Sequence, residues 1–372
     1  MRKLSACVIF ITVMMLCVSA SADIVYTTSS GDMGLILASA ESTDISSTKY
    51  SGSMSDTLLG SYWDGGNSRI ILVNRTTDTT TSGDTALIFA NNNLSAPIIS
   101  EPRVLAGVYN AQSLAGSYNG RGLFFASGVS IYEFSTDTFS FKRSYTYPVN
   151  ASEDITPQIT ALLSGTSNVY AIVEGDISGD VVLAFDGQLR EDAKDSFNKY
   201  VAPSGTNAIA WLNNSSIVIG HDSGVSSLKS SSFVSLVSSD APVKALCMDE
   251  KTGFYFAEQS ESGSEYTTTL KHYSSVNNIT TLCTETGGSE CRLLYDTNNG
   301  LLAALIGSKI LIYRMKNDVL IDEYDSASLG GQPVNITMSC VNGDDGRTSS
   351  GCDIAGAGII MFLAGVMIIR RR

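Results

Sequence analysis

Two short polar clusters contain residue types that carry out chemistry in other proteins. His221-Asp222-Ser223 holds the three side chains of a hydrolase triad. Triad members meet in space, however, and neighbours along a strand point to opposite faces. No G-x-S-x-G sequence accompanies the cluster, so a nucleophile elbow is not predicted. We interpret His221 as a loop histidine and His272 as a solvated side chain of an outer strand.

The second cluster, from Asp176 to Asp180, offers two carboxylates that could bind calcium. A complete calcium loop needs more oxygen ligands and a bidentate Glu at its end. The sequence instead favours a hairpin turn between Val173 and Val181. The chain also contains no P-loop, dinucleotide-binding fingerprint or H-E-x-x-H motif. We therefore predict no catalytic residue, no metal ligand and no cofactor.

Aromatic side chains beside turns are the better candidates for a binding site. Trp63 precedes Asp64, a pairing that is suited to stacking on a sugar ring. Tyr62, Trp63 and Tyr118 are the candidate ligand contacts, and Tyr295 has a similar position. The alternative is that these aromatics pack in the core, which is their more frequent use.

The cysteines allow one plausible disulfide. Cys283 and Cys291 flank the segment 284–290, and we predict that they pair across it. Cys247 with Cys340 is a weaker pair. Disulfides are permitted only if the chain is exported. Zinc is not expected, because no C-x-x-C and no nearby His supports tetrahedral ligation.

The N-terminus has the layout of a secretory signal peptide. Arg2 and Lys3 precede an apolar run, and Ala20-Ser21-Ala22 forms an A-x-A cleavage site. Residue 16, before Cys17, is a leucine, which argues against lipoprotein processing. We predict that cleavage between Ala22 and Asp23 removes residues 1–22.

The C-terminus has the layout of a membrane anchor. An uncharged apolar run covers residues 354–369 and is followed by Arg370, Arg371 and Arg372. A helix of this length reaches about 24 Å, which is short for about 30 Å of hydrocarbon. The terminal arginines favour a cytoplasmic end. The region between the two terminal segments is therefore predicted to lie outside the cytoplasmic membrane.

The segment Ser349-Ser350-Gly351-Cys352-Asp353, the apolar run and the arginine cluster together resemble the Synergist-CTERM type of C-terminal sorting tail. The plan is also similar to that of GlyGly-CTERM tails. The resemblance covers residues 349–372 only. It implies cleavage near Cys352 and attachment to the cell surface or outer membrane by the export and sorting machinery. A plain single-pass anchor is the alternative.

The charge balance excludes one class of partner. The chain has 24 Lys+Arg, 37 Asp+Glu and a net charge of −13. Five of the basic residues lie in the two terminal segments, so the region from Asp23 to Asp353 carries 19 basic and 37 acidic residues, a net charge of −18. Such a surface repels nucleic acid, because phosphate binding relies on Lys and Arg.

Repeated hairpins define the fold class. A short apolar strand, a turn rich in Asp, Asn, Ser and Gly, and a strongly apolar strand recur along the chain. The second strands of these hairpins begin at residues 35, 70, 123, 169, 217, 254 and 301. A period of about 40–50 residues with four strands per unit is typical of a β-propeller. We predict an all-β propeller over residues 23–327 and a flexible linker over 328–348.

Seven blades are predicted, and six are possible because the first unit has little sequence for its outer strands. A pair of stacked β-sandwiches is the alternative architecture.

The predicted function is an exported, surface-tethered binding module for a protein or a glycan. The rivals are an exported propeller enzyme acting on glycans, as a lyase or hydrolase, and a structural cell-surface component. Carboxylates from several blades converging at one rim would favour the enzyme.

Overall fold

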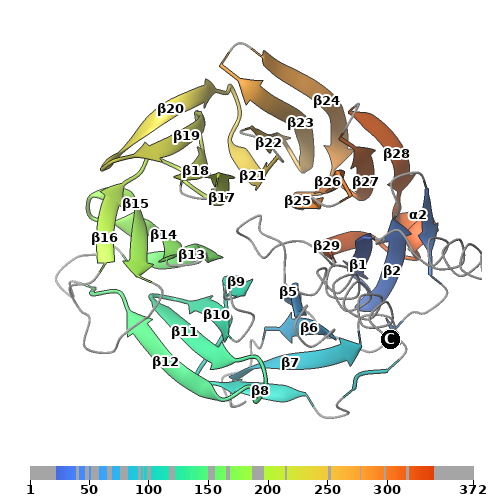
Figure 1. Ribbon diagram of the computed structural model, residues 1–372, viewed down its shortest axis with the longest axis horizontal. Helices are drawn as coiled ribbons and strands as arrows, with labels where there is room; N and C mark the ends of the chain where they lie inside the picture. Colours follow the sequence, from blue (N-terminus) through green and yellow to red (C-terminus); the bar gives the residue numbers. More distant parts are fainter. Residues whose placement is uncertain are drawn as a thin grey trace, which may run out of the picture.

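The fold is known from a computed structural model. It describes residues 22–38, 42–46, 50–51, 58–64, 69–75, 83–90, 94, 96–98, 102–116, 122–149, 156–164, 168–186, 197–213, 216–249, 253–276, 278–296, 299–315 and 318–338. Seven antiparallel sheets are arranged in a ring around a central axis (Figure 1). The prediction of an all-β propeller with seven blades is confirmed, and the six-bladed alternative is excluded.

The first three blades have the following strands. Blade 1 contains β29 (Pro333–Met338), β1 (Ala22–Thr28), β2 (Asp32–Ala38), β3 (Thr43–Ile45) and β4 (Tyr50–Ser51); blade 2 contains β5 (Leu58–Asp64), β6 (Arg69–Asn74), β7 (Gly83–Ala90) and β8 (Arg103–Ala106); blade 3 contains β9 (Ser113–Gly116), β10 (Gly122–Ser127), β11 (Ser130–Ser135) and β12 (Phe141–Thr146).

The remaining four blades repeat the four-strand pattern. Blade 4 contains β13 (Gln158–Ser164), β14 (Asn168–Asp176), β15 (Gly179–Asp186) and β16 (Phe197–Val201); blade 5 contains β17 (Ala208–Asn213), β18 (Ser216–His221), β19 (Gly224–Lys229) and β20 (Ser232–Ser238); blade 6 contains β21 (Val243–Met248), β22 (Phe254–Ser262), β23 (Glu265–Ser275) and β24 (Asn278–Gly287); blade 7 contains β25 (Cys291–Asp296), β26 (Leu301–Ile306), β27 (Lys309–Arg314) and β28 (Val319–Tyr324).

Burial decreases from the second strand of a blade to its outermost strand, as blade 7 shows, and this explains the hydropathy of the sequence. All six residues of β26 are buried, because neighbouring blades cover both faces of this strand. β28 lies at the rim of the same blade, and most of its side chains are partly or fully exposed. Continuous apolar runs therefore mark strands between two blades, as they do in other sheets that are covered on both faces.

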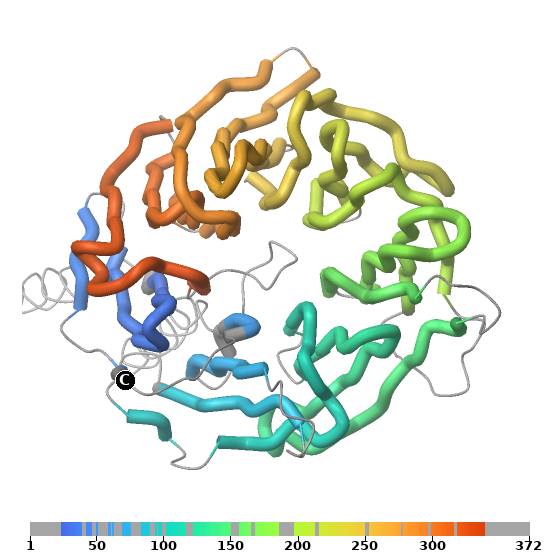
Figure 2. Tube along the Cα trace, turned by 180° about the vertical axis from the view of Figure 1, so that it is seen from behind, coloured from blue at the N-terminus to red at the C-terminus, as the bar shows by residue number. Residues whose placement is uncertain are grey.

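The C-terminal strand closes the ring. β29 pairs antiparallel with β1, with Tyr26 opposite Ile336 and Ile24 opposite Met338. Figure 2 shows this red strand lying against the blue N-terminal strands. The short helix α2 (Ser326–Leu329) leads into it and is capped by the side chain of Asp325.

Ring closure corrects the predicted domain boundary. The propeller extends to Met338, so the linker predicted over residues 328–348 starts too early. The hairpin at Tyr26 and Leu35 forms the second and third strands of blade 1, because β29 supplies the innermost strand. The partner of β29 lies at the other end of the chain, so no local pattern indicated that this segment pairs.

Both terminal signals remain predictions. Ala22 and Asp23 begin β1, opposite Ala38 and Leu37. The rest of the predicted signal peptide, Cys352 and the apolar run 354–369 lie outside the described residues. Within the residues that the structure describes, no helix is long and apolar enough to cross a membrane.

Candidate functional site

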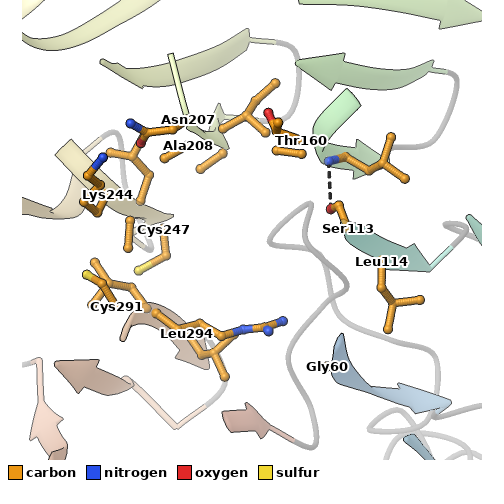
Figure 3. A pocket seen from close by; sticks show the side chains of 18 of the residues that line it. Gly60, Ser113, Leu114, Thr160, Asn207, Ala208, Lys244, Cys247, Cys291 and Leu294 are labelled. Atoms are coloured by element: carbon orange, nitrogen blue, oxygen red, sulfur yellow. Dashed lines mark hydrogen bonds between the residues drawn. The ribbon is translucent and has the colours of Figure 1, made fainter. Parts of the chain in front are cut away.

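A pocket of about 380 Å³ occupies the central channel, within the range of about 300–1,000 Å³ that is usual for ligand sites (Figure 3). The innermost strands of blades 2 to 7 line it, namely β5, β9, β13, β17, β21 and β25. These strands face the axis in Figure 1. The pocket is therefore built from six separate blades and exists only in the closed ring.

Polar and charged side chains enter this pocket from the first residues of the innermost strands or from the residues just before them. They are Gln112, Ser113, Thr160, Asn207, Lys244 and Arg292. Lys244 and Arg292 are the only charged residues among the described residues of the lining, which includes no Asp, Glu or His. The pocket is thus cationic in a chain whose net charge is −13.

β-Bulges recur where the innermost strands begin. The pairing register shifts between Leu58 and Gly60, between Ile159 and Ala161, and between Val243 and Ala245. The extra residues are Leu59, Thr160 and Lys244, and each lines the pocket. A bulge redirects a side chain relative to the regular pleat. The local backbone therefore helps to present Thr160 and Lys244 at the channel.

The guanidinium of Arg292 is held by the strand that closes the ring. Its Nη1 donates to Oδ1 of Asn335 at 3.1 Å, and Nδ2 of Asn335 donates to the carbonyl of Leu59 at 3.3 Å. These bonds link blades 7, 1 and 2. A Cβ atom at Gly60 would lie 3.5 Å from Nη1 of Arg292, in ordinary van der Waals contact, so this glycine is a close neighbour of the guanidinium.

Lys244 differs from Arg292 in its surroundings. Its side chain is exposed, and it forms no ion pair with any residue that the structure describes. It acts electrostatically on the thiol of Cys291 across the boundary between blades 6 and 7. Figure 3 places Lys244, Cys247 and Cys291 along one side of the pocket. An exposed ammonium in a channel is a ready contact for an anion.

Two oxygens of the lining have no hydrogen-bond partner among the described residues. They are Oγ1 of Thr160 and Oδ1 of Asn207, and both are buried. The amide nitrogen of Asn207 donates to the carbonyl of Gly205 at 2.9 Å. Ser113 is satisfied, because its Oγ accepts the amide hydrogen of Leu162 at 3.1 Å (Figure 3). An unpaired buried polar atom costs about 1–3 kcal/mol, which a ligand or water could recover.

The rest of the lining is mainly apolar and includes the aromatic residues Trp211 and Tyr295. The indole of Trp211 donates to the carbonyl of Ser164 at 3.2 Å and packs edge-on against Tyr170. Trp211 therefore also joins blades 4 and 5. Tyr295, which the sequence suggested as a second-rank candidate, does line the pocket.

The structure tests the predicted ligand contact for only one of the three principal aromatic candidates, Tyr62. Tyr62 packs against the apolar cluster between blades 2 and 3, with its ring on Gly116, and does not line the pocket. The backbone of Trp63 pairs with Ile70, while its side chain lies outside the described part. Tyr118 lies outside it altogether, so for Trp63 and Tyr118 ligand contact remains a prediction.

The sequence analysis missed Lys244 and Arg292. Each interrupts an apolar run at the start of an innermost strand, between Val243 and Ala245 and between Cys291 and Leu293. A cation within an apolar run was the sequence feature that could have identified these two residues. A single cation in an otherwise buried strand is costly unless it reaches solvent or a partner. For an innermost strand of a propeller, the nearest solvent is in the central channel, so a cation on such a strand is expected to point there.

The two histidines form hydrogen bonds and packing contacts within the fold. Nδ1 of His221 accepts the amide hydrogen of Ser223 at 3.3 Å, so Nε2 carries the proton and donates to Oγ of Ser226 at 2.9 Å. His221 is buried and is the last residue of β18, so it is a strand residue and not the loop residue that the sequence suggested. His272 was predicted to be solvated but is half-buried, stacked on Tyr255 and 3.2 Å from Oδ2 of Asp249.

The predicted turn between Val173 and Val181 is present, and both of its carboxylates are used within the fold. Asp176 accepts hydrogen bonds from Lys199, Ser178 and Tyr147. Burial would raise the pKa of Asp176, but these bonds outweigh it and hold the pKa well below its usual range. Asp180 accepts the amide hydrogen of Thr206 at 3.0 Å. Among the described residues no group of three potential metal ligands occurs.

The structure does not contain the predicted disulfide. Cys283 and Cys291 are free thiols, as is Cys247, while Cys340 lies outside the described residues. Cys283 belongs to the outer strand β24 of blade 6, and Cys291 begins the inner strand β25 of blade 7. The segment 284–287 continues β24 and is extended, so it does not form the tight loop that would bring the two sulfurs together.

Comparisons with known proteins support the architecture. The chain resembles a structure described as a putative 6-phosphogluconolactonase from Bacteroides uniformis, with 13% identity, a TM-score of 0.57 and coverage of 86% of this chain and 99% of that one. It also resembles a functionally unknown protein from Desulfotomaculum acetoxidans, with 9% identity, a TM-score of 0.55 and the same coverage. These identities establish a shared fold alone.

No family model matches the sequence, and no curated protein matches it. The class of protein is therefore defined by its architecture, a seven-bladed β-propeller with a polar, cationic pocket in its channel.

Proposed function

We propose that this protein is an exported, surface-tethered β-propeller that binds a ligand in the central channel. The observation that carries the proposal is the convergence of the innermost strands of six blades on one pocket, with polar side chains at their N-terminal ends. Apolar walls with a few convergent polar groups are typical of a binding site. The signal-peptide pattern and the sorting-tail resemblance support export and tethering.

A binding role is preferred to catalysis on glycans because of the residues in the pocket. Glycoside hydrolysis generally uses two carboxyl groups separated by about 5–10 Å. The described lining contains no Asp or Glu, so it supplies neither member of such a pair. A purely structural surface component would not need polar groups inside the channel.

Binding can be tested with the full chain on a panel of neutral and acidic oligosaccharides and acidic peptides. We expect at least one member to bind, and Lys244→Trp to abolish binding by filling the channel. Lys244 is exposed, so its replacement should preserve the fold, which circular dichroism would check. Lys229→Trp is the matched control, because Lys229 is also exposed but lies at the end of β19, away from the pocket.

Two results would contradict this proposal. One is a panel with no binding member. The other is binding that Lys244→Trp leaves intact.

Export and tethering need a separate test. Mass spectrometry of the mature protein should find Asp23 at the N-terminus and a C-terminus near Cys352. A mature chain that begins upstream of Asp23, or one from surface material that ends at Arg372, would contradict the proposed processing.

A further inference from the structure

We propose that the channel recognises an acidic sugar residue, whose carboxylate lies between Lys244 and Arg292. This inference rests on the proposed binding function and specifies the ligand class of the same pocket. The two cations are supplied by neighbouring blades, since Lys244 lies on β21 and Arg292 on β25.

The charge distribution is the first argument. The chain has a net charge of −13, yet both charged residues of the described lining are cations. Glu290, next to Cys291 in the chain, does not line the pocket, and Arg75 is the cation that acts on it electrostatically. A neutral ligand would not require this local reversal of sign. Charge-assisted hydrogen bonds to a carboxylate would use it.

The position of the guanidinium is the second argument. Asn335 holds Arg292 through Nη1, and Gly60 lies beside that nitrogen. A guanidinium carries five N–H donors in a fixed plane, and this geometry suits a carboxylate. Fixing the group beforehand lowers the entropy cost of binding an anion. Lys244 then adds a mobile charge that can adjust to the ligand.

The unpaired oxygens indicate what surrounds the carboxylate. Oγ1 of Thr160 and Oδ1 of Asn207 lack partners in the described part of the protein, on the two blades that precede blade 6. A hydroxyl group can donate to the amide oxygen and can both donate to and accept from the threonine. A sugar acid offers several hydroxyls beside one carboxylate. An acidic peptide offers mainly additional carboxylates and amides.

The experiment compares three probes by isothermal titration calorimetry with the full chain. They are trigalacturonate, the neutral sugar trigalactose and the acidic peptide triglutamate. We expect trigalacturonate to bind at least tenfold more tightly than the other two probes. Lys244→Gln should weaken trigalacturonate about tenfold, as expected for the loss of one charge-assisted bond, and should leave trigalactose unchanged.

Arg292 needs a graded test, because it also bonds to Asn335. Arg292→Lys keeps the charge but loses the planar donor array, so its affinity should lie between those of the wild type and Arg292→Gln. Lys229 and Arg103 are exposed and lie outside the pocket, so Lys229→Gln and Arg103→Gln are matched controls, and both should bind like the wild type.

The outcomes separate the two proposals. Equal binding of trigalactose and trigalacturonate, abolished by Lys244→Trp, would overturn the acidic-sugar assignment and leave the proposed function intact. Tighter binding of triglutamate would also overturn it, in favour of an acidic peptide. Failure of the oligosaccharides and of triglutamate to bind would overturn both. If Lys244→Gln binds trigalacturonate as tightly as the wild type does, the carboxylate of the sugar does not contact Lys244, and the assignment is overturned.

Discussion

Arg292 donates from Nη1 to Oδ1 of Asn335 at 3.1 Å, and this bond joins the last blade to the strand that closes the ring. Asn335 also donates to the carbonyl of Leu59 in blade 2. One residue of the C-terminal strand therefore positions a pocket cation and bridges the two blades on either side of the closure. Ring closure and the binding site share the same hydrogen bonds.

Replacing Asn335 should affect both properties. Asn335→Ala removes bonds to a guanidinium and to a carbonyl, so we expect the free energy of unfolding to fall by about 1–3 kcal/mol. Binding of trigalacturonate should weaken as well, because Arg292 loses its orientation. Urea unfolding and calorimetry would measure the two effects. Asn198→Ala, at an exposed position on β16, is the control and should change neither.

Removing the closing strand should have a larger effect. A chain that ends at Gly331 lacks β29, whose Ile336 and Met338 are 0% and 1% exposed. Losing two such side chains costs at least about 3 kcal/mol, and β1 becomes an unpaired edge. We expect a marked fall in Tm by calorimetry and a greater tendency to aggregate. A chain ending at Val341 retains β29 and should melt like the full protein; equal Tm values for the two truncations would contradict the role of β29.

The stability should depend on pH through His221. Burial lowers the pKa of His221, and the charge of Asp222 opposes this effect. The unfolded chain therefore binds a proton at a higher pH than the folded protein, at a pKa of about 6.5. The stabilisation is complete above that value and is lost as the pH falls through the unfolded and then the folded pKa.

His221→Gln tests this directly. The difference in unfolding free energy between wild type and variant should shrink as the pH is lowered from 8 to 5.5. Urea titrations at several pH values would measure it, and an NMR titration of the imidazole would give the folded pKa. A pKa above the ordinary value would refute the assignment.

The cysteines should behave as thiols. Alkylation in denaturant without a reducing agent should modify both Cys283 and Cys291, as judged by peptide mass spectrometry. In the native protein Cys291 should react slowly at pH 8, since burial, and to a smaller extent Glu290, raise its pKa to about 12. The thiolate is the reactive form. Detection of a peptide in which Cys283 is cross-linked to Cys291 would contradict this prediction and support the disulfide that the sequence suggested.

Much of the fold could be predicted because its signals are local. The apolar run of β26 and the turn from Asp296 to Gly300 recur in equivalent form in other blades, and short-range hydrophobic patterning specifies such hairpins. The hairpin turn after Asp176 was also recognisable. The aromatic residues were harder to assign, because the same side chain can pack between blades, as Tyr62 does, or line the channel, as Tyr295 does.

The sequence by itself determined the strand content and the repeat length, and it favoured seven blades over six, since most blades are encoded by consecutive hairpins. Only the tertiary structure decided that β29 completes blade 1 and that Lys244 and Arg292 line the same central pocket. Both facts depend on contacts between segments far apart in the chain. These contacts form only when the ring closes, so no local sequence pattern predicts them.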